Sequence, residues 1–201
     1  MNSPARRTAR GRREGVRCAL VTVACAVASV AAQAGDFSVG AGAGVDRGKT
    51  DCVAGYACDH GSAYAKVFAG YQLPANFELQ AVYFDAGHFD GGDTSALGTA
   101  FGGRFKVSGL GVAAGYRWAF APGWSLKGQL GVASVRTRFD YAVPFSGDAS
   151  MTTTQPLVGL SVGYEIAPSW RLSLDLDETR FKVHTTRGSL RMLGVAAQFS
   201  F

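Results

Sequence analysis

The chain ends in Ala196-Ala197-Gln198-Phe199-Ser200-Phe201, a stretch in which apolar and polar residues alternate up to a terminal aromatic residue. In a transmembrane β-barrel every second residue of a strand faces lipid, and aromatic residues lie at the membrane interface. The ending is typical of such a strand. It predicts Phe199 and Phe201 on the lipid face and the polar residues beside them on the inward face. A buried strand of a soluble protein has no comparable reason to place its largest apolar residue at the free carboxylate.

The N-terminus predicts a secretory signal peptide. Residues 1–17 contain six arginines and one acidic residue, and the apolar run that follows ends at Ala32-Gln33-Ala34. A basic segment, a short apolar segment and small residues at a cleavage site are the features of such signals. We therefore expect export and cleavage after Ala34, with a signal peptide over 1–34 and one barrel domain over 35–201.

Loss of this segment makes the chain electrically neutral. The full sequence has 20 basic and 15 acidic residues; six arginines and one glutamate belong to 1–34, so 14 of each remain. Binding to nucleic acid requires a clustered cationic surface. We expect no nucleic-acid partner.

Cys52 and Cys58 are the cysteines that remain after the signal peptide. In an exported protein two cysteines this close together are expected to form a disulfide. The loop that it closes is short, so the expected stabilisation is about 2 kcal/mol. The alternative, a metal site with His60, matches no common zinc pattern, and we expect neither a metal nor a cofactor.

Three segments that begin at Gly70, Gly115 and Gly163 resemble one another. Each contains Gly-Tyr, a proline, an aromatic residue and then a leucine, and the segments follow at spacings of 45 and 48 residues. Proline is excluded from central strands and favours turns, so each segment is expected to be a turn between two strands. The aromatic residues on both sides of each turn fit an interfacial belt.

Longer polar segments alternate with these turns, and together they predict an all-β fold, an eight-stranded antiparallel up-and-down transmembrane β-barrel. Several of the expected strands reach the ~9–11 residues that a tilted strand needs to cross a membrane. We expect the short turns in the periplasm and the longer loops outside the cell. The expected strands are 36–46, 62–73, 77–89, 104–120, 124–140, 154–167, 170–183 and 189–201, and the expected loops are 47–61, 90–103, 141–153 and 184–188.

Alternation within the strands separates a charged face from an apolar face. A soluble barrel also alternates, but the signal peptide, the aromatic turns and Phe201 favour a membrane barrel with its polar face inward. Because eight strands leave room only for side chains, we expect the inward charges, four of each sign, to pair with one another. This expected lumen network consists of Lys66, Glu78, Arg117, Lys127, Glu165, Arg171, Asp175 and Asp177.

The strand expected over 104–120 departs from this alternation. Arg104 and Lys106 have the same parity as Leu110, whereas Arg117 has the opposite parity. Either a bulge near Gly109 shifts the phase, or the first two cations stand above the membrane.

Two motifs, Lys66-Val67-Phe68-Ala69-Gly70-Tyr71 and Tyr83-Phe84-Asp85-Ala86-Gly87, resemble those of small eight-stranded outer-membrane proteins of the OmpA-like and opacity-type family. The resemblance covers 35–201. It implies a monomer in the outer membrane that contacts outer-membrane lipids and lipopolysaccharide. It also implies that the barrel-assembly machinery recognises the ending with Phe199 and Phe201.

Three functions fit these patterns. The first is a structural, adhesive or envelope/host-interaction role carried by the loops, and the second is a narrow gated pore. The third, a lipid-modifying enzyme, would use His60-Gly61-Ser62, but Gln72 and Pro74 stand where an acid is needed; we expect no catalytic residues. Cations near the outer strand ends are expected to contact lipopolysaccharide phosphates, with ordinary solvated charge as the alternative. They are Arg136, Arg138, Arg180 and Lys182.

The role of the terminal residue is testable with Phe201→Asp. A charge at the membrane interface costs only about 0–1 kcal/mol, so the purified variant should refold in detergent almost normally. Assembly in cells should fall strongly, because the recognised pattern is lost. Heat-modifiable mobility on gels measures both. Wild-type amounts of the folded variant in the outer membrane would contradict an assembly signal at this position.

Overall fold

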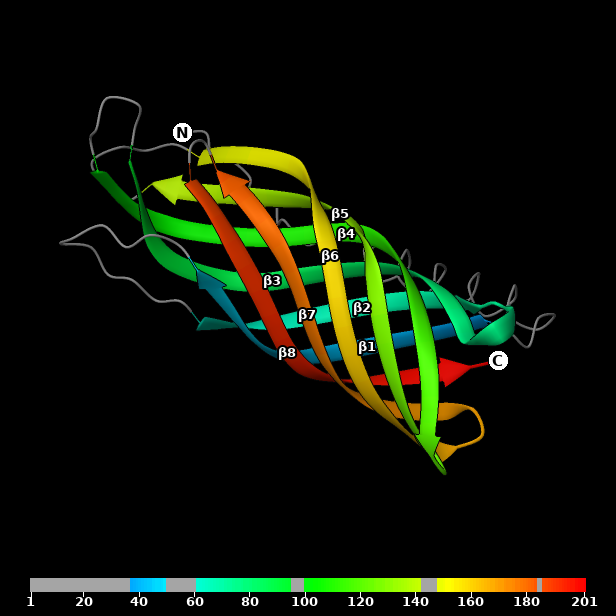
Figure 1. Cartoon of the computed structure of the whole chain (residues 1–201). Helices are drawn as coiled ribbons and strands as arrows, with labels where there is room; N and C mark the ends of the chain where they lie inside the picture. Colours follow the sequence, from blue (N-terminus) through cyan, green and yellow to red (C-terminus); the bar gives the residue numbers. More distant parts are fainter. Residues whose placement is uncertain (1–36, 50–60, 95–99, 142–147, 184–185) are drawn as a thin grey trace, which may run out of the picture. The chain divides into compact units, whose positions relative to one another are not determined.

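The computed structural model describes residues 37–49, 61–94, 100–141, 148–183 and 186–201. These residues form eight strands, labelled in Figure 1, and one short 3-10 turn. No helix in these ranges is long and apolar enough to cross a membrane. The predicted signal peptide (1–34), Cys52, Cys58 and His60 lie outside the described residues.

The elements follow one another along the chain as a simple meander. They are β1 (Phe37–Lys49), β2 (Gly61–Gln72), η2 (Pro74–Asn76), β3 (Phe77–Thr94), β4 (Ala100–Ala121), β5 (Trp124–Tyr141), β6 (Asp148–Ala167), β7 (Trp170–Val183) and β8 (Thr186–Ser200).

Each strand pairs antiparallel with its neighbours, and β8 pairs with β1, so the sheet is a closed barrel. The predicted eight-stranded up-and-down barrel is thereby confirmed. The paired residues, followed once around the barrel from Ser38, return to the first strand at Gly48, a shift of ten residues (48 − 38). Such a shift requires tilted strands, and with eight strands the interior has room only for side chains.

Short connections join the strands at one end of the barrel, which we call the turn end. η2 links β2 to β3, Pro122 and Gly123 link β4 to β5, and residues 168–169 link β6 to β7. Gly123 has a φ of +76°, a conformation that favours glycine. The opposite end, where residues 50–60, 95–99, 142–147 and 184–185 connect the strands, is the loop end.

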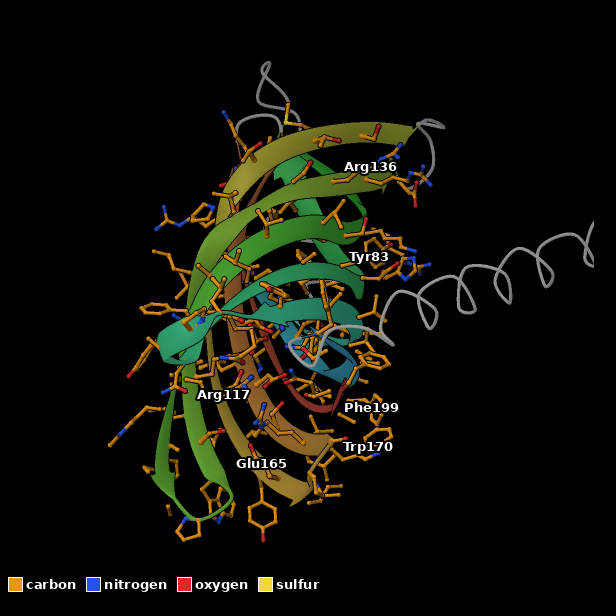
Figure 2. The ribbon with its side chains drawn as sticks, turned by 90° about the vertical axis from the view of Figure 1, so that its right-hand side faces the viewer. Tyr83, Arg117, Arg136, Glu165, Trp170 and Phe199 are labelled. Atoms are coloured by element: carbon orange, nitrogen blue, oxygen red, sulfur yellow. The ribbon has the colours of Figure 1, made fainter. Side chains whose placement is uncertain are left out.

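Directly paired aromatic residues ring the turn end. One cross-strand aromatic pair joins β1 to β2, one joins β3 to β4, one joins β5 to β6 and one joins β7 to β8. Their ring centroids are 4.8 to 5.2 Å apart. Cross-strand aromatic contacts stabilise sheets beyond the area that they bury. The pairs are Phe37–Tyr71, Phe77–Tyr116, Trp124–Tyr164 and Trp170–Phe199, and the last of them is labelled in Figure 2.

Above this ring the outward residues are apolar and then become charged toward the loop end. On β7, Leu172, Leu174 and Leu176 are exposed and are followed outward by Glu178 and Arg180. The same change occurs on β1, where Val45 precedes Arg47, and on β8, where Leu193 is followed by Arg191 toward the loop end. An apolar band bounded by polar residues is the lipid-facing surface of a membrane barrel.

Two predictions about the loop end were wrong. The expected loops 90–103 and 141–153 are largely strand, because β3 continues to Thr94, β4 starts at Ala100 and β6 starts at Asp148. Polar composition suggested loops there, but hairpins that extend beyond the apolar band carry polar residues on both faces.

Of the two alternatives for the strand that contains Arg104, the bulge near Gly109 is absent, since β4 pairs with β5 without interruption around that residue. The shift lies on β3 instead, where Gly87 is the extra residue between Ala86 and His88. Arg104 and Lys106 therefore stay on the outward face, beyond the apolar band.

The pairs of aromatic residues around the turn end predict local energetic coupling. In a double-mutant cycle of Trp124→Ala and Tyr164→Ala, we expect a coupling free energy of about 0.5–1.5 kcal/mol. Urea unfolding of the barrel in lipid vesicles measures it. The control cycle of Trp124→Ala with Phe199→Ala joins residues on different strand pairs and should be additive within about 0.5 kcal/mol. Equal coupling in both cycles would contradict the pairwise arrangement.

Candidate functional site

The lumen contains the strongest concentration of buried charge in the described part of the chain. All eight residues of the expected lumen network lie on the inward faces of their strands. Figure 2 shows two of them, Arg117 and Glu165, inside the lower half of the barrel. The register divides the network into two triads and one further pair.

Glu78 is shared by two cations. The Arg117 guanidinium donates to its carboxylate, and Lys127 Nζ lies 3.3 Å from its Oε1. Glu78 is only 2% exposed. This Glu78 triad (Arg117, Glu78, Lys127) thus carries one excess positive charge, and it lies at the turn end.

Lys66 has the reverse arrangement, one cation between two acids. Its Nζ lies 2.9 Å from Asp175 Oδ2 and 2.6 Å from Asp177 Oδ2, and all three side chains are buried. Asp177 also accepts a 2.9 Å hydrogen bond from Gln129 Nε2. This Lys66 triad (Asp175, Lys66, Asp177) carries one excess negative charge, deeper in the barrel.

A phenylalanine lies between the two triads. The ring centroid of Phe68 is 5.8 Å from Lys66 Nζ and 6.0 Å from Lys127 Nζ, within cation–π distance of both. The ring lies across Gly40, where a Cβ atom would come within 2.2 Å of it. Phe68 therefore holds the two lysines apart, each with its own carboxylates.

Glycine also makes room for the deeper triad. A Cβ atom on Gly159 would lie 2.4 Å from Asp177 Oδ1 and 2.5 Å from Gln129 Nε2. The hydrogen bond between these two side chains passes over the bare backbone of β6. A larger residue at this position would displace the acid that Lys66 binds.

The remaining pair of the expected network lies at the mouth of the turn end. Arg171 donates to the Glu165 carboxylate, and Glu165 is 52% exposed. The Glu165 amide donates to the carbonyl of Gly123 at 2.9 Å, which ties the end of β6 to the β4–β5 turn. This pair opens to the surroundings, in contrast to the two triads.

An apolar layer closes the lumen between the triads and the loop end. On β2 Tyr64 follows Lys66 in this direction, and on β3 Phe84 lies three inward positions beyond Glu78. Neighbouring inward residues on the other strands are also apolar and buried. We define the layer as Tyr64, Phe84, Val107, Val135, Leu157, Phe181, Leu190 and Met192.

Sequence reasoning missed this layer and also Asp46, an inward carboxylate that is 1% exposed. The expectation was a polar inward face along the whole strand. In the layer the alternation is reversed: the buried inward residues are apolar, whereas outward neighbours are charged, as Arg136 is beside Val135 and Arg180 is beside Phe181. The sequence indicates the layer at two positions, because the aromatic residues at positions 64 and 84 have the same parity as the inward residues Lys66 and Glu78.

The cations expected at the outer strand ends point outward. Arg136 and Arg138 lie on β5 and Arg180 and Lys182 on β7, near the loop end. Figure 2 shows Arg136 on the outer surface, as it does Tyr83 of β3.

Like charges are adjacent in this region. Lys106 on β4 is directly paired with Arg138, and Arg47 on β1 is directly paired with Arg191 on β8. One cation of each pair lies close to an acid: Lys106 Nζ is 3.2 Å from Asp85 Oδ2, and Arg191 Nε is 2.8 Å from Glu178 Oε2. The outward loop end is therefore rich in cations.

The structure also describes the two aromatic residues of the expected assembly signal and the serine of the enzymatic alternative. Phe199 faces outward in contact with Trp170, and Phe201 follows the last strand residue, Ser200. Ser62, the serine of the enzymatic alternative, accepts a hydrogen bond from the His88 amide at 3.1 Å.

Comparison with known proteins agrees with this architecture. The family model "Outer membrane protein beta-barrel domain" matches residues 18–201. A search of functionally characterised sequences finds no significant match.

Among solved structures, the chain is similar to Neisserial surface protein A (16% identity, 82% of this chain and 97% of that chain, TM-score 0.62). It is also similar to OprG of Pseudomonas aeruginosa (15% identity, 84% and 97%, TM-score 0.56). A third is Ail, the attachment invasion locus protein of Yersinia pestis, in complex with the heparin analogue sucrose octasulfate (18% identity, 82% and 99%, TM-score 0.52). At these identities the likeness establishes the fold alone.

The Glu78 triad predicts a large stability difference between two conservative substitutions. Glu78→Gln leaves two buried cations without their carboxylate, so the free energy of unfolding should fall by about 3–5 kcal/mol. The control, Glu178→Gln, breaks a half-exposed pair with Arg191 and should cost at most about 1 kcal/mol. Urea unfolding in vesicles measures both. Similar losses for the two variants would contradict the buried role of Glu78.

Proposed function

Since the chain belongs to the outer-membrane β-barrel family, we propose that it is a non-conducting barrel of the outer membrane whose structural or adhesive role is carried by its loop end. The apolar layer carries this proposal. A conducting pore needs a polar, hydrated path through the barrel. Here buried apolar side chains from β2 to β8 line the lumen beyond the Lys66 triad. Asp46, Thr137 and Thr179 are buried polar residues paired with members of the layer.

The proposal includes an orientation. The turn end faces the periplasm and the loop end faces the outside, as in barrels with short periplasmic turns and longer extracellular loops. It also includes export by the signal peptide 1–34, cleavage after Ala34, and a disulfide between Cys52 and Cys58 in the first loop. The barrel domain then spans 35–201, and assembly of the barrel uses the ending with Phe199 and Phe201.

The partners that we propose for the loop end are anionic. Arg136 and Arg138 on β5, and Arg180 and Lys182 on β7, face outward beyond the apolar band. In the proposed orientation this is the depth of lipopolysaccharide phosphates, which guanidinium groups bind with matching geometry. Ail, a barrel of the same fold, is known in complex with a polysulfated ligand, which makes sulfated polymers a second class of anion to examine.

A narrow gated pore is the alternative function. The two triads follow one another along the lumen, and an exchange of partners between Lys66 and Lys127 would rearrange them. Such an exchange leaves the apolar layer in place, so it opens no continuous path. We assign no catalytic role to the chain.

Single-channel recording tests the proposal. The wild-type barrel in a planar bilayer should show no stable conductance steps at neutral pH. Replacement of the layer residues Phe84 and Met192 by serine should introduce steps, because polar side chains and space let water enter the layer. Leu174→Ser on the lipid face serves as the control and should remain silent. Regular steps from the wild-type protein would contradict a closed barrel and favour the pore.

A further inference from the structure

A recess opens at the turn end of the barrel. Its volume is about 430 Å³, which is within the range of ligand pockets. The η2 turn, the β4–β5 hairpin and the ends of β6 and β7 form its walls. It therefore lies at the mouth of the lumen, where Arg117, Glu165 and Arg171 line it.

The charge around this recess is positive. Of the charged residues that line it, Arg117 and Arg171 are cations and Glu165 is the acid. Arg117 also shares the Glu78 carboxylate with Lys127, which lies deeper. Glu165 is more than half exposed, so it can rotate away from Arg171 at little cost in packing.

Arg171 retains unused hydrogen-bonding capacity. Its terminal nitrogen donates to Glu165, but its Nε atom is buried and has no hydrogen-bond partner among the described residues. A guanidinium binds an oxyanion best through two parallel N–H groups. The Nε atom and one terminal nitrogen form such a pair of donors, and a carboxylate that replaces Glu165 would accept from both.

The rest of the lining suits a chain end better than a small ion. Apolar contact area comes from Leu73 and Ala75, and the amide of Asn76 offers a donor and an acceptor. A peptide terminus presents a carboxylate, a small side chain and a peptide group, and these match the three kinds of lining. The dimensions of the recess leave space for a residue beside the anion.

We propose that this recess captures the free α-carboxylate of a peptide chain end. Arg171 binds the carboxylate through Nε and a terminal nitrogen, Arg117 supplies long-range attraction, and Glu165 occupies the site in the absence of ligand. In the proposed orientation the peptide comes from the periplasm. The site itself does not depend on whether the lumen conducts.

The experiment compares two probes on the refolded barrel in detergent micelles. N-acetyl-alanyl-alanine with a free carboxylate and its C-terminal amide differ only in the group that Arg171 binds. Titration calorimetry should show that the acid binds about tenfold more tightly than the amide. In ¹⁵N spectra the Nε–H signal of Arg171 should shift with the acid alone.

Two variants at the site should have opposite effects. Arg171→Gln should abolish the preference for the acid, whereas Glu165→Gln should strengthen acid binding because it removes the competing carboxylate. Arg136→Gln, on the outward face near the loop end, is the matched control and should bind like the wild type. Heat-modifiable mobility verifies that each variant is folded.

Three outcomes would overturn the proposal. They are equal affinity for acid and amide, an unchanged preference in Arg171→Gln, and tighter binding of inorganic phosphate than of the peptide acid. The last would assign the recess to small oxyanions. Conductance recordings are independent of all three, so failure here is distinguishable from failure of the closed-barrel proposal.

Discussion

The narrow lumen is the constraint on which the rest of the molecule depends. In a membrane every backbone N–H and C=O group must be paired within the sheet, and closure of β8 onto β1 meets that requirement. Eight strands with a shift of ten residues leave an interior without bulk water. Charged side chains deep in the lumen therefore pair with other inward side chains, as Glu78 does with Arg117 and Lys127.

The two triads satisfy this requirement with opposite imbalances. One carboxylate serves two cations at the turn end, and one cation serves two carboxylates deeper in the barrel. Their sum is neutral, but the charge is displaced along the barrel axis. The Phe68 ring lies within cation–π distance of both lysines, and glycines at positions 40 and 159 give the large side chains their space. The displaced positive charge faces the turn-end recess.

Much of this arrangement was predictable from the sequence, for identifiable reasons. Alternation of polar and apolar residues assigned Asp175 and Asp177 to the inward face, because the opposite face of β7 carries large apolar residues. It assigned Lys66 to the inward face against the smaller apolar residues of the opposite face of β2. Alternation cannot assign partners. That Glu78 joins two cations follows from the register between β3, β4 and β5, which depends on the whole closed sheet. The extent of β3 and β4 toward the loop end was missed because strand pairing outside the membrane does not require apolar residues.

The aromatic pairs at the turn end have a consequence for how such a barrel is divided. Each pair joins two strands that are consecutive in the chain, β1 with β2, β3 with β4, β5 with β6 and β7 with β8. Each couple is linked covalently at the loop end and by a tilted or edge-to-face aromatic contact at the other. The barrel is thus a set of four modules, each fastened at both ends, and the near-regular recurrence of the Gly-Tyr turns reflects their length. Duplication of one module would add two strands and one aromatic contact. It would keep the alternation of inward and outward residues, so barrels of this kind change size in steps of two strands.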